Sequence, residues 1–285
     1  MKKVYLAAIV LATAFFASCG GSKESKTVEQ QVETTDSVVE ETVFVVTPVK
    51  SIEVLYNGKH SNTLNLKYDN QNRLIETIDE FSRSNKITYS DTEVKIINED
   101  LNPDGTYSLV KTFTYKYSDG KPTECNLEMG QSGRVNKKYS FDGDKISGIE
   151  NVFNGEVSKY AYKWDNGCMT EQIINYHADN NPQKTTFEYT DMCNPFNVDI
   201  FSFVTPEIDI LAFDKGCISD FLPSKSVFTW TSNDNIKETQ RTAFEYNIDD
   251  ATGKITSINI NRTVITDELG TINEETTIIT LNLTY

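Results

Sequence analysis

The sequence predicts an all-β protein, an antiparallel meander of repeated hairpins that forms a curved sheet or a barrel-like array. Two observations indicate this fold. Segments that alternate aromatic and polar residues recur along the chain, and a period of two is typical of a strand with one buried face. Each segment ends on an aromatic residue and is followed by Asp, Asn and Gly, which favour tight turns. The segments are LNLKY, FTYKY, KYSF, YAYKW, TFEY and AFEY, ending at residues 68, 117, 141, 164, 189 and 246.

The spacing of the repeat matches a two-stranded hairpin with its loops. From Tyr117 onward the terminal aromatic residues follow one another after 24, 23 and 25 residues. In the segment YDNQNRL, Asn72 occupies the position that other turns give to glycine, because Asn also tolerates a positive φ. A basic residue often follows the turn, and then an apolar residue begins the next strand, as in Arg73 and Leu74. The other basic residues in this position are Lys121, Lys145 and Lys254.

The N-terminus has the pattern of a secretory signal over residues 1–18. Two lysines precede an apolar run that is too short for an ordinary membrane span. The segment FASC resembles the lipobox of bacterial lipoproteins, although Phe16 stands where leucine is usual. This resemblance implies that Cys19 becomes the lipid-modified first residue and anchors the protein in the membrane. The alternative is an ordinary cleaved signal that leaves Cys19 unmodified.

Residues 19–42 predict an acidic, flexible tether. After Cys19 they are rich in Ser, Thr, Glu and Gln and hold no aromatic residue, so they cannot bury enough surface to become ordered. The segment DSV resembles the O-glycosylation motif of exported Bacteroidota proteins, which implies modification at Ser37; the alternative is a plain solvated tether. Residues 43–285 are then expected to form a single β domain.

The net charge of the chain excludes some classes of binding partner. The 27 basic and 42 acidic residues give −15, and removal of Lys2 and Lys3 with the signal gives 25 against 42, or −17. Nucleic acid and anionic lipid headgroups both need clustered positive charge, so neither is an expected partner of the domain.

The segment from about 190 to 225 interrupts the period, and we expect a short helical insertion around 194–213. Asn194 can cap a helix and Pro195 can occupy its first position. This helix is predicted to be a lid or plug packed on the sheet, and the alternative is a partner-binding helix. Its apolar residues at helical spacing are Phe196, Ile200, Phe203 and Val204.

Four cysteines remain after Cys19, and an exported chain allows disulfides in three complete pairings. Cys125 stands where other repeats carry an apolar residue, so we expect it to be a small buried thiol. Cys193 and Cys217 flank the insertion and are the predicted pair if a disulfide forms. The fourth residue is Cys168.

Motifs that would carry chemistry are scarce. His60 and His177, the two histidines, lie in turn-like segments where a solvated side chain is expected. No nucleophile elbow, phosphate-binding glycine loop or paired-histidine zinc motif occurs in the sequence. The Asp-rich turns offer too few oxygen ligands for a calcium loop. We therefore expect no catalytic residue, no metal and no cofactor.

Two resemblances extend this reading. The hairpin phrase resembles the tyrosine-aspartate repeats of bacterial wall-associated and toxin-shell proteins. Most of the chain resembles a family of Bacteroidota lipoproteins of unknown function with a porin-like β fold, through the lipobox, the tether, the hairpins and the segments YTDMCNPFNVDIFSF and DFLPSKSVFTW. That resemblance implies a curved or barrel-like sheet, and it implies neither an activity nor catalytic residues.

The favoured function is that of a lipid-anchored protein of the outer membrane, periplasmic or surface-facing, acting as a non-catalytic scaffold or interaction protein for an envelope partner. The alternative is a glycan or small-ligand binding module, and a carboxylate-based glycosidase is less favoured. The aromatic residues weighed for sugar stacking are Tyr115, Tyr139, Tyr162 and Trp164, although large rings more often fill β cores.

A membrane-spanning barrel is a further alternative. The alternating C-terminus TIITLNLTY resembles the assembly signal of outer-membrane barrels. Against it, the aromatic residues are not arranged in two girdles, and a lipid anchor would be redundant for a spanning barrel.

Overall fold

The computed structural model describes residues 48–102, 104–129, 133–176, 181–196, 198–201, 214–232 and 236–285. The chain divides into a first unit, Met1–Val43, and a second unit, Phe44–Tyr285, which holds all the described strands. The expected signal, the tether, Cys19, Ser37 and His177 lie outside the described residues.

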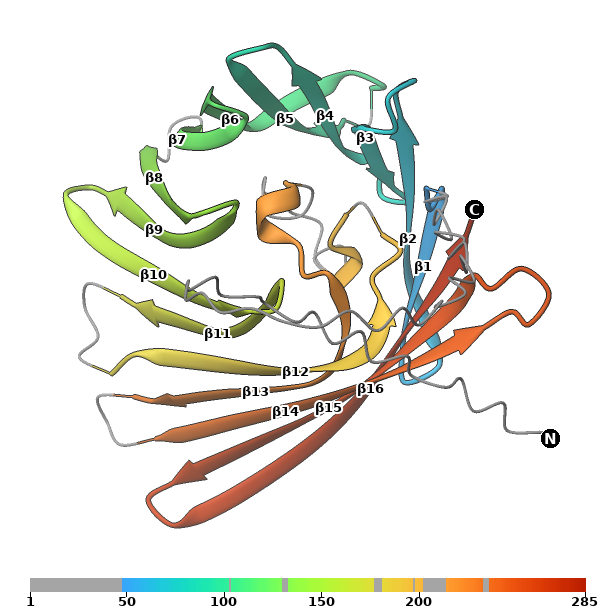
Figure 1. Cartoon of the computed structure of the whole chain (residues 1–285), viewed down its shortest axis with the longest axis vertical. Coiled ribbons are helices and arrows are strands. Elements are labelled where there is room, and N and C mark those ends of the chain that lie inside the picture. Colours follow the sequence, from blue (N-terminus) through green and yellow to red (C-terminus); the bar gives the residue numbers. More distant parts are fainter. Residues whose placement is uncertain are drawn as a thin grey trace, which may run out of the picture. The chain divides into compact units, whose positions relative to one another are not determined.

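The described strands form a closed antiparallel barrel, which decides between the open sheet and the barrel that the sequence left open. Each strand pairs with its neighbours in the sequence, and the last strand pairs with the first (Figure 1). The strands are β1 Ser51–Tyr56, β2 Lys59–Tyr68, β3 Leu74–Asp79, β4 Arg83–Tyr89, β5 Glu93–Leu101, β6 Tyr107–Ser118, β7 Lys121–Glu128, β8 Arg134–Asp142, β9 Lys145–Phe153, β10 Glu156–Asp165, β11 Cys168–Asn175, β12 Gln183–Cys193, β13 Phe221–Thr231, β14 Lys237–Ile248, β15 Ile255–Glu268 and β16 Thr271–Thr284.

The two ends of the barrel differ in their connections. We call the end at which the chain enters β1 and leaves β16 the turn end; it carries the connections from even-numbered strands to the next odd-numbered ones. The far end carries the connections from odd-numbered to even-numbered strands. The predicted Asp/Asn/Gly turns lie at the turn end, and Asn72 has the expected positive φ, 58°. The Asp69 side chain accepts hydrogen bonds from the backbone N–H groups of Gln71 and Arg73, both at 2.9 Å.

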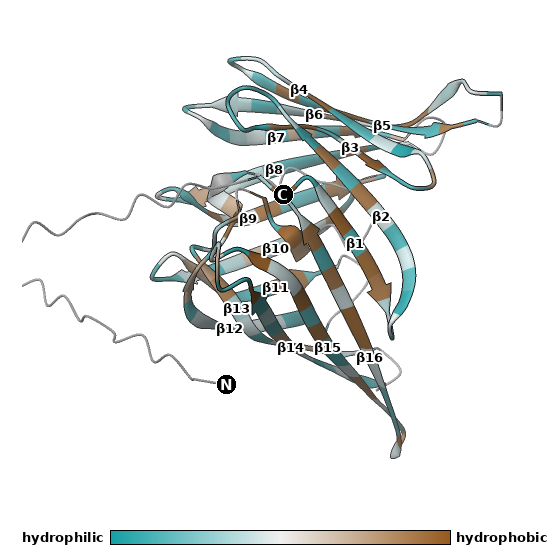
Figure 2. Cartoon of the chain, turned by 90° about the vertical axis from the view of Figure 1, so that its right-hand side faces the viewer, coloured by the Kyte–Doolittle hydropathy of each residue, from teal (hydrophilic) through white to brown (hydrophobic). Residues whose placement is uncertain are grey.

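Apolar side chains face the interior and charged side chains face outward. Ile52 and Val54 of β1 are 0% and 2% exposed, whereas Glu53 between them lies on the outside. The same alternation gives bands of opposite hydropathy along the strands in Figure 2. The period of two that predicted strands therefore also separates the inner wall from the outer wall.

A bulge recurs beside the terminal aromatic residue of five of the six repeats, and two residues further along in the sixth. Lys67 pairs with Glu76 and Tyr68 pairs with Leu74, so β3 holds one extra residue here. Without it, Leu74 and Glu76 would face the same side, because residues two apart in a regular strand share a face. The bulge places Leu74 inside and Glu76 outside. The register shifts in the same way between Lys116 and Tyr117, Ser140 and Phe141, Lys163 and Trp164, and Glu188 and Tyr189.

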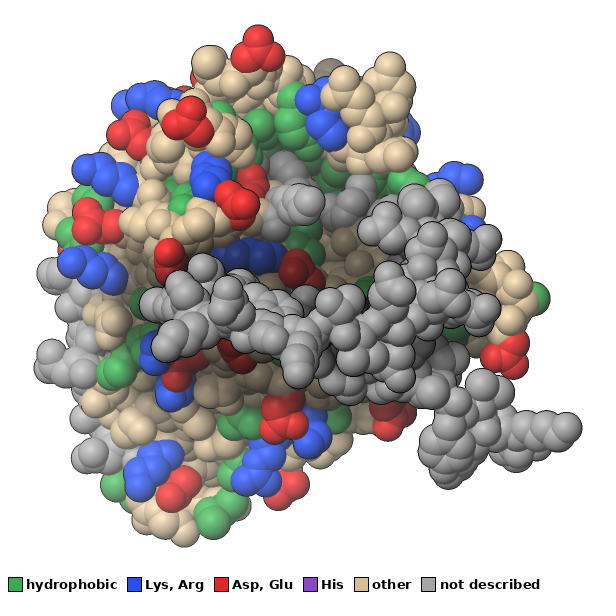
Figure 3. Space-filling view, viewed as in Figure 1, with side chains coloured by type: hydrophobic (Ala, Val, Ile, Leu, Met, Phe, Trp, Pro, Cys, Tyr) green, Lys and Arg blue, Asp and Glu red, His purple; other side chains and the backbone are tan. Residues whose placement is uncertain are grey.

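Cross-strand ion pairs cover the outer wall. Lys116 Nζ lies 3.0 Å from a carboxylate oxygen of Glu124 on the next strand, and Glu171 bridges Lys163 and Lys184 at 2.6 Å each. Figure 3 shows basic and acidic side chains side by side around the rim. A membrane-spanning barrel has an apolar outer band. The paired charges on this outer wall interrupt any such band. Further pairs of this kind are Lys67–Glu76, Lys86–Glu99, Arg134–Glu128, Lys159–Glu150 and Lys225–Glu188.

Aromatic residues at the ends of β4, β10, β12, β14 and β16 tie neighbouring hairpins together at the turn end. Each of these five donates a hydrogen bond to a backbone carbonyl at or near the start of the preceding strand. Where a basic residue precedes that carbonyl, its cation lies over the same ring, and Lys121 lies in the same way over Phe141, whose ring has no hydrogen-bond donor. The bonds are Tyr89 to Leu74 (2.7 Å), Trp164 to Ile146 (2.6 Å), Tyr189 to Met169 (2.8 Å), Tyr246 to Pro223 (2.6 Å) and Tyr285 to Ile255 (2.9 Å). The cations are Arg73 over Tyr89, Lys121 over Phe141, Lys145 over Trp164 and Lys254 over Tyr285.

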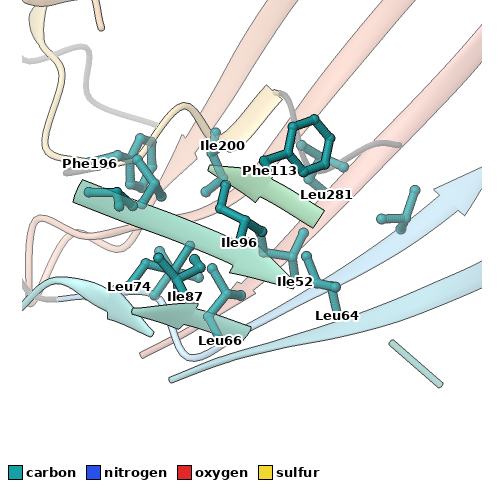
Figure 4. Packing of buried hydrophobic residues seen from close by; sticks show 14 of the residues in the cluster. Ile52, Leu64, Leu66, Leu74, Ile87, Ile96, Phe113, Phe196, Ile200 and Leu281 are labelled. Atoms are coloured by element: carbon teal, nitrogen blue, oxygen red, sulfur yellow. The ribbon is translucent and has the colours of Figure 1, made fainter. Parts of the chain in front are cut away.

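The insertion between β12 and β13 is a plug, as expected, but its first residues are not the predicted helix. Phe196, Val198 and Ile200 are 7%, 1% and 1% exposed, which is burial at every second residue rather than every third or fourth. Asn194 accepts a hydrogen bond from the backbone N–H of Phe196 at 3.0 Å, in a local turn instead of a helix cap. The backbone here is irregular and enters a 3-10 turn only at Ile200 and Phe201, and Figure 4 shows Phe196 and Ile200 in one cluster with strand residues. Residues 202–213 lie outside the described part.

Candidate functional site

The returning part of the insertion is fixed to the strands at the turn end. Tyr117 donates its hydroxyl to Asp214 at 3.0 Å, and the Gly216 backbone N–H donates to the same carboxylate at 2.9 Å. Burial raises the pKa of Asp214 above its ordinary value, and these two hydrogen bonds oppose that rise. The short 3-10 helix η4, Lys215–Cys217, begins directly after this contact. Lys145 adds hydrogen bonds to the Ile218 carbonyl and to Asp220, both at 2.9 Å.

Two pockets that both contain charged side chains flank Asp214. One has a volume of about 440 Å³ between Arg73, Tyr89 and Tyr117, and the other about 450 Å³ between Lys121, Lys145 and Asp220. Most of the charged side chains around these pockets form ion pairs. Arg73 pairs with Asp69 at 2.8 Å, and Lys121 pairs with Asp144 at 2.9 Å. These pockets consequently belong to the contacts that hold the turn end together.

A third, mainly apolar cavity lies between the insertion and the inner wall. We call it the ring cavity; its volume is about 160 Å³. Phe201 of the insertion meets Phe244 of β14 edge to face, with ring centroids 5.0 Å apart. Aromatic rings from two separate parts of the chain therefore form this cavity. It is lined by Met169, Phe187, Tyr189, Asn194, Asp199, Phe201, Cys217, Ile218, Ser219, Phe221, Pro223 and Phe244.

Two hydroxyl groups meet at the edge of the ring cavity. The Tyr189 hydroxyl donates to the Met169 carbonyl and lies 2.9 Å from Ser219 Oγ. Ser219 Oγ also accepts a hydrogen bond from the Met169 backbone N–H at 3.1 Å. Burial raises the pKa of Tyr189 to about 12, so this hydroxyl stays neutral at physiological pH. The cavity thus presents neutral hydrogen-bonding groups beside its rings.

The inner wall becomes polar toward the far end. On β14 and β15, Phe244 pairs with the buried Ile260, Thr242 pairs with Arg262, and Gln240 pairs with Val264 one rung further out. Ile260 is buried, whereas Arg262 and Gln240 are only half-buried although they share the inward face. We call Ser226, Phe228, Gln240 and Arg262 the inner strip; pairing of Phe228 with Gln240 and of Ser226 with Thr242 places the β13 members on the same face. Solvent reaches this part of the inner wall.

The far end exposes apolar side chains at its hairpin tips. Eight of the ten exposed large hydrophobic residues among the described positions lie there, and Leu269 and Ile272 are the most exposed, at 85% and 68%. These eight residues are spread over the tips of five hairpins. The eight far-end residues are Phe81, Leu101, Tyr107, Leu109, Phe153, Tyr176, Leu269 and Ile272.

The aromatic residues weighed for sugar stacking are core residues. Tyr115, Tyr139 and Tyr162 are 0%, 8% and 7% exposed, and Trp164 donates its ring N–H to the Ile146 carbonyl. The core interpretation is therefore confirmed for them. Half-buried aromatic residues of the inner wall, such as Phe228, were not predicted as candidates. The alternation shows which face of the sheet a residue lies on, but not how far along the barrel it lies and so whether solvent reaches it.

His60 is exposed, as expected, but it is paired rather than only solvated. Its ring nitrogens lie 3.2 Å from Glu53 and 2.7 Å from Glu80 on the outer wall. Hydrogen bonds to Glu80, and then to Glu53, raise the pKa of His60.

The four described cysteines form no disulfide with one another in this structure. Cys125 is fully buried, as predicted. Cys193 is exposed and Cys217 is half-buried at the ring cavity. A Cys193–Cys217 disulfide stays a prediction, which thiol counting before and after reduction would test.

Helices of the described ranges are all too short or too polar to cross a membrane.

Comparisons with known proteins identify the architecture. No family model matches the sequence, and no curated protein matches it. A crystal structure of a porin-like protein from Bacteroides uniformis ATCC 8492 aligns with a TM-score of 0.58 at 15% identity, covering 84% of this chain and 99% of that chain. A porin-like protein from Bacteroides vulgatus ATCC 8482 gives a TM-score of 0.55 at 15% identity, covering 84% and 98%. The likeness shows the fold: this chain is an antiparallel β-barrel with a porin-like architecture.

Proposed function

We propose that this chain is a lipid-anchored protein of the cell envelope whose barrel stands in water and binds a protein partner through its far end, without catalysis. The observation that carries the proposal is the concentration of exposed apolar side chains at the far-end tips. Burying such side chains against a partner removes apolar surface from water and so favours association.

The outer wall supports a barrel in water rather than a membrane channel. Its strands carry Lys–Glu pairs at positions where a spanning barrel carries apolar residues. The insertion, with Ile200 and Phe196 buried in the core, also occupies part of the interior. In planar lipid bilayers we expect the purified protein to produce no conductance steps, whereas regular single-channel steps would contradict the proposal.

The membrane attachment rests on the lipobox. Cys19→Ala should move the protein from the membrane to the soluble fraction, because the domain needs no other anchor in this proposal. A variant that still sediments with membranes would contradict the lipid anchor. Protease treatment of intact cells, with an outer-membrane integrity control, would then show whether the domain faces the surface or the periplasm.

Photo-cross-linking tests the far-end interface directly. A photo-reactive amino acid at position 109 or 269 should capture a discrete partner in living cells, since Leu109 and Leu269 are 64% and 85% exposed. The matched control is position 248, because Ile248 is 45% exposed but lies at the turn end. Equal capture from all three positions, or none from the far end, would contradict the proposal.

Glycan binding is a second candidate function. The inner strip favours it, at a position different from that of the core aromatic residues that the sequence suggested. An aromatic ring, an amide and a guanidinium on one solvent-accessible wall offer stacking and hydrogen bonds to a sugar. We expect Phe228→Ala and Gln240→Ala to abolish retardation by a binding polysaccharide in affinity electrophoresis. The control is Thr239→Ala, whose side chain faces outward from the same strand. Unchanged retardation in both variants would exclude the inner strip.

A further inference from the structure

The ring cavity differs from the rest of the apolar interior because its rings are not fully packed. Phe187, Phe201 and Phe244 lie inside the barrel but are only half-buried. Ile258 and Ile260, on the strand beside Phe244, are 0% and 6% exposed. Protein interiors normally close such gaps, since an unfilled apolar space loses dispersion contacts on its lining atoms. The cavity is therefore space that a ligand could fill with a gain in contacts.

The size of the cavity selects a small molecule. Its volume is about 160 Å³. An apolar cavity of about 150 Å³ lined by aliphatic and aromatic side chains takes up benzene or xenon. A single six-membered aromatic ring is of the size that this volume holds. The edge-to-face contact of Phe201 and Phe244 offers the same geometry to a third ring.

The polar groups of the cavity select the charge of the ligand. The hydroxyls of Tyr189 and Ser219 are neutral, and each oxygen has a lone pair that can accept a hydrogen bond. The Asp199 carboxyl group, also at the lining, would repel an anion. A neutral ring with one hydroxyl or amino group is therefore favoured over an aromatic carboxylate.

We propose that the ring cavity binds a neutral, single-ring aromatic molecule and that this binding strengthens the docking of the insertion. Phe201 and Ile218 belong to the insertion, whereas Phe187 and Phe244 belong to the strands. The cavity exists only when both parts are in contact. By linkage, a ligand that binds the docked form stabilises it. This site is separate from the far-end tips, so it does not depend on the proposed interface.

Phenol, benzene and benzoate are suitable probes with the full chain. Saturation-transfer NMR should show binding of phenol and benzene, and no binding of benzoate at the same concentration. Hydrogen exchange of the segment 214–222 should slow when phenol is present. Equal signals from benzoate and phenol would overturn the charge selection, and an unchanged exchange rate would overturn the coupling to the insertion.

Two cavity variants test the location of the site. Phe244→Trp should fill the space and weaken phenol binding at least about tenfold, the change that corresponds to about 1.4 kcal/mol. Phe187→Ala should enlarge the cavity and shift the preference from phenol toward indole, which keeps the test decisive if the tryptophan variant does not fold. The control is Phe228→Ala, on the same inner wall but outside the cavity. Phenol binding that the two cavity variants leave unchanged, or that the control abolishes, would overturn the proposal.

Discussion

The turn end and the far end of the barrel are built from the same strands, but large apolar side chains are packed at the turn end and exposed at the far end. At the turn end, five aromatic residues are hydrogen-bonded to the neighbouring hairpin, as Tyr246 is to Pro223, and the insertion packs into the interior. At the far end, apolar side chains such as Leu109 and Leu269 project from the tips into solvent. Buried contacts are therefore concentrated at one end of the barrel and exposed apolar side chains at the other.

The turn residues alone do not cause the difference, because Asn57-Gly58 and Asn154-Gly155 at the far end also follow an aromatic residue and have positive φ. The turn-end rings are held in addition by hydrogen bonds to the neighbouring strand, as Tyr189 is to Met169. The tips of β5–β6 and β15–β16 instead expose Leu109 and Leu269. Four variants, two of them with a control at the far end, test this difference.

The largest effect is expected from the plug. Ile200→Ala should lower the free energy of unfolding by about 2–5 kcal/mol, because it leaves a cavity at a side chain that is 1% exposed. Leu109→Ala at the far end, where the side chain is 64% exposed, should change it by less than about 0.5 kcal/mol. Urea unfolding measures both values. Equal losses would show that the two ends do not differ in stability.

A smaller effect is expected from a single hydroxyl at the turn end. Tyr246→Phe removes the donor to the half-buried Pro223 carbonyl, and the loss of this hydrogen bond should cost about 1 kcal/mol. Tyr107→Phe at the far end is the matched control, since Tyr107 is 45% exposed. Chemical denaturation of the two variants compares them. A change in the control as large as that in Tyr246→Phe would refute the role given to the aromatic ties.

The ion pairs of the outer wall, between the two ends, should contribute less. Glu171→Gln breaks contacts with both Lys163 and Lys184. Hydrogen bonds from Lys163, and then from Lys184, lower the pKa of Glu171 in the folded protein. The contribution of Glu171 to stability is therefore present above its unfolded pKa and is lost as pH falls through its folded pKa. We expect a slightly lower urea midpoint at pH 7, and a smaller difference in 1 M NaCl. A difference that grows with salt would argue against an ionic origin.

The smallest effect is expected at His60, and it depends on pH. The folded pKa of His60 is raised by Glu80 and Glu53, so folding favours the protonated ring. The contribution of protonated His60 to stability is complete below the unfolded pKa of about 6.5, and it disappears as pH rises through the pKa of His60 in the folded protein. His60→Gln should therefore be slightly less stable than the parent at pH 5.5 and equal to it at pH 9. Thermal unfolding at both pH values checks this, and the reverse order would show that the pairing with the carboxylates does not stabilise the fold.

The sequence by itself determined the hairpins, their turns and the two faces of the strands. The segments expected to end at Tyr68, Tyr117 and Trp164 do end within one residue of these positions. Local chemistry was sufficient here, because turn residues act on their own backbone and alternation places every second side chain on one face. The basic residue after the turn could also be recognised in the sequence, but its position over the next aromatic ring could not be predicted.

Only the tertiary structure decided closure, the shape of the insertion and the position of the candidate site. Pairing of β16 with β1 joins residues more than 200 positions apart, and no local pattern records such a contact. The spacing of Phe196 and Ile200 fits a helix, but the irregular backbone of this segment buries Val198 between them as well, because all three side chains pack in the core. The ring cavity arises where the insertion and four strands meet. Its volume depends on packing between distant segments, which a one-dimensional pattern does not contain.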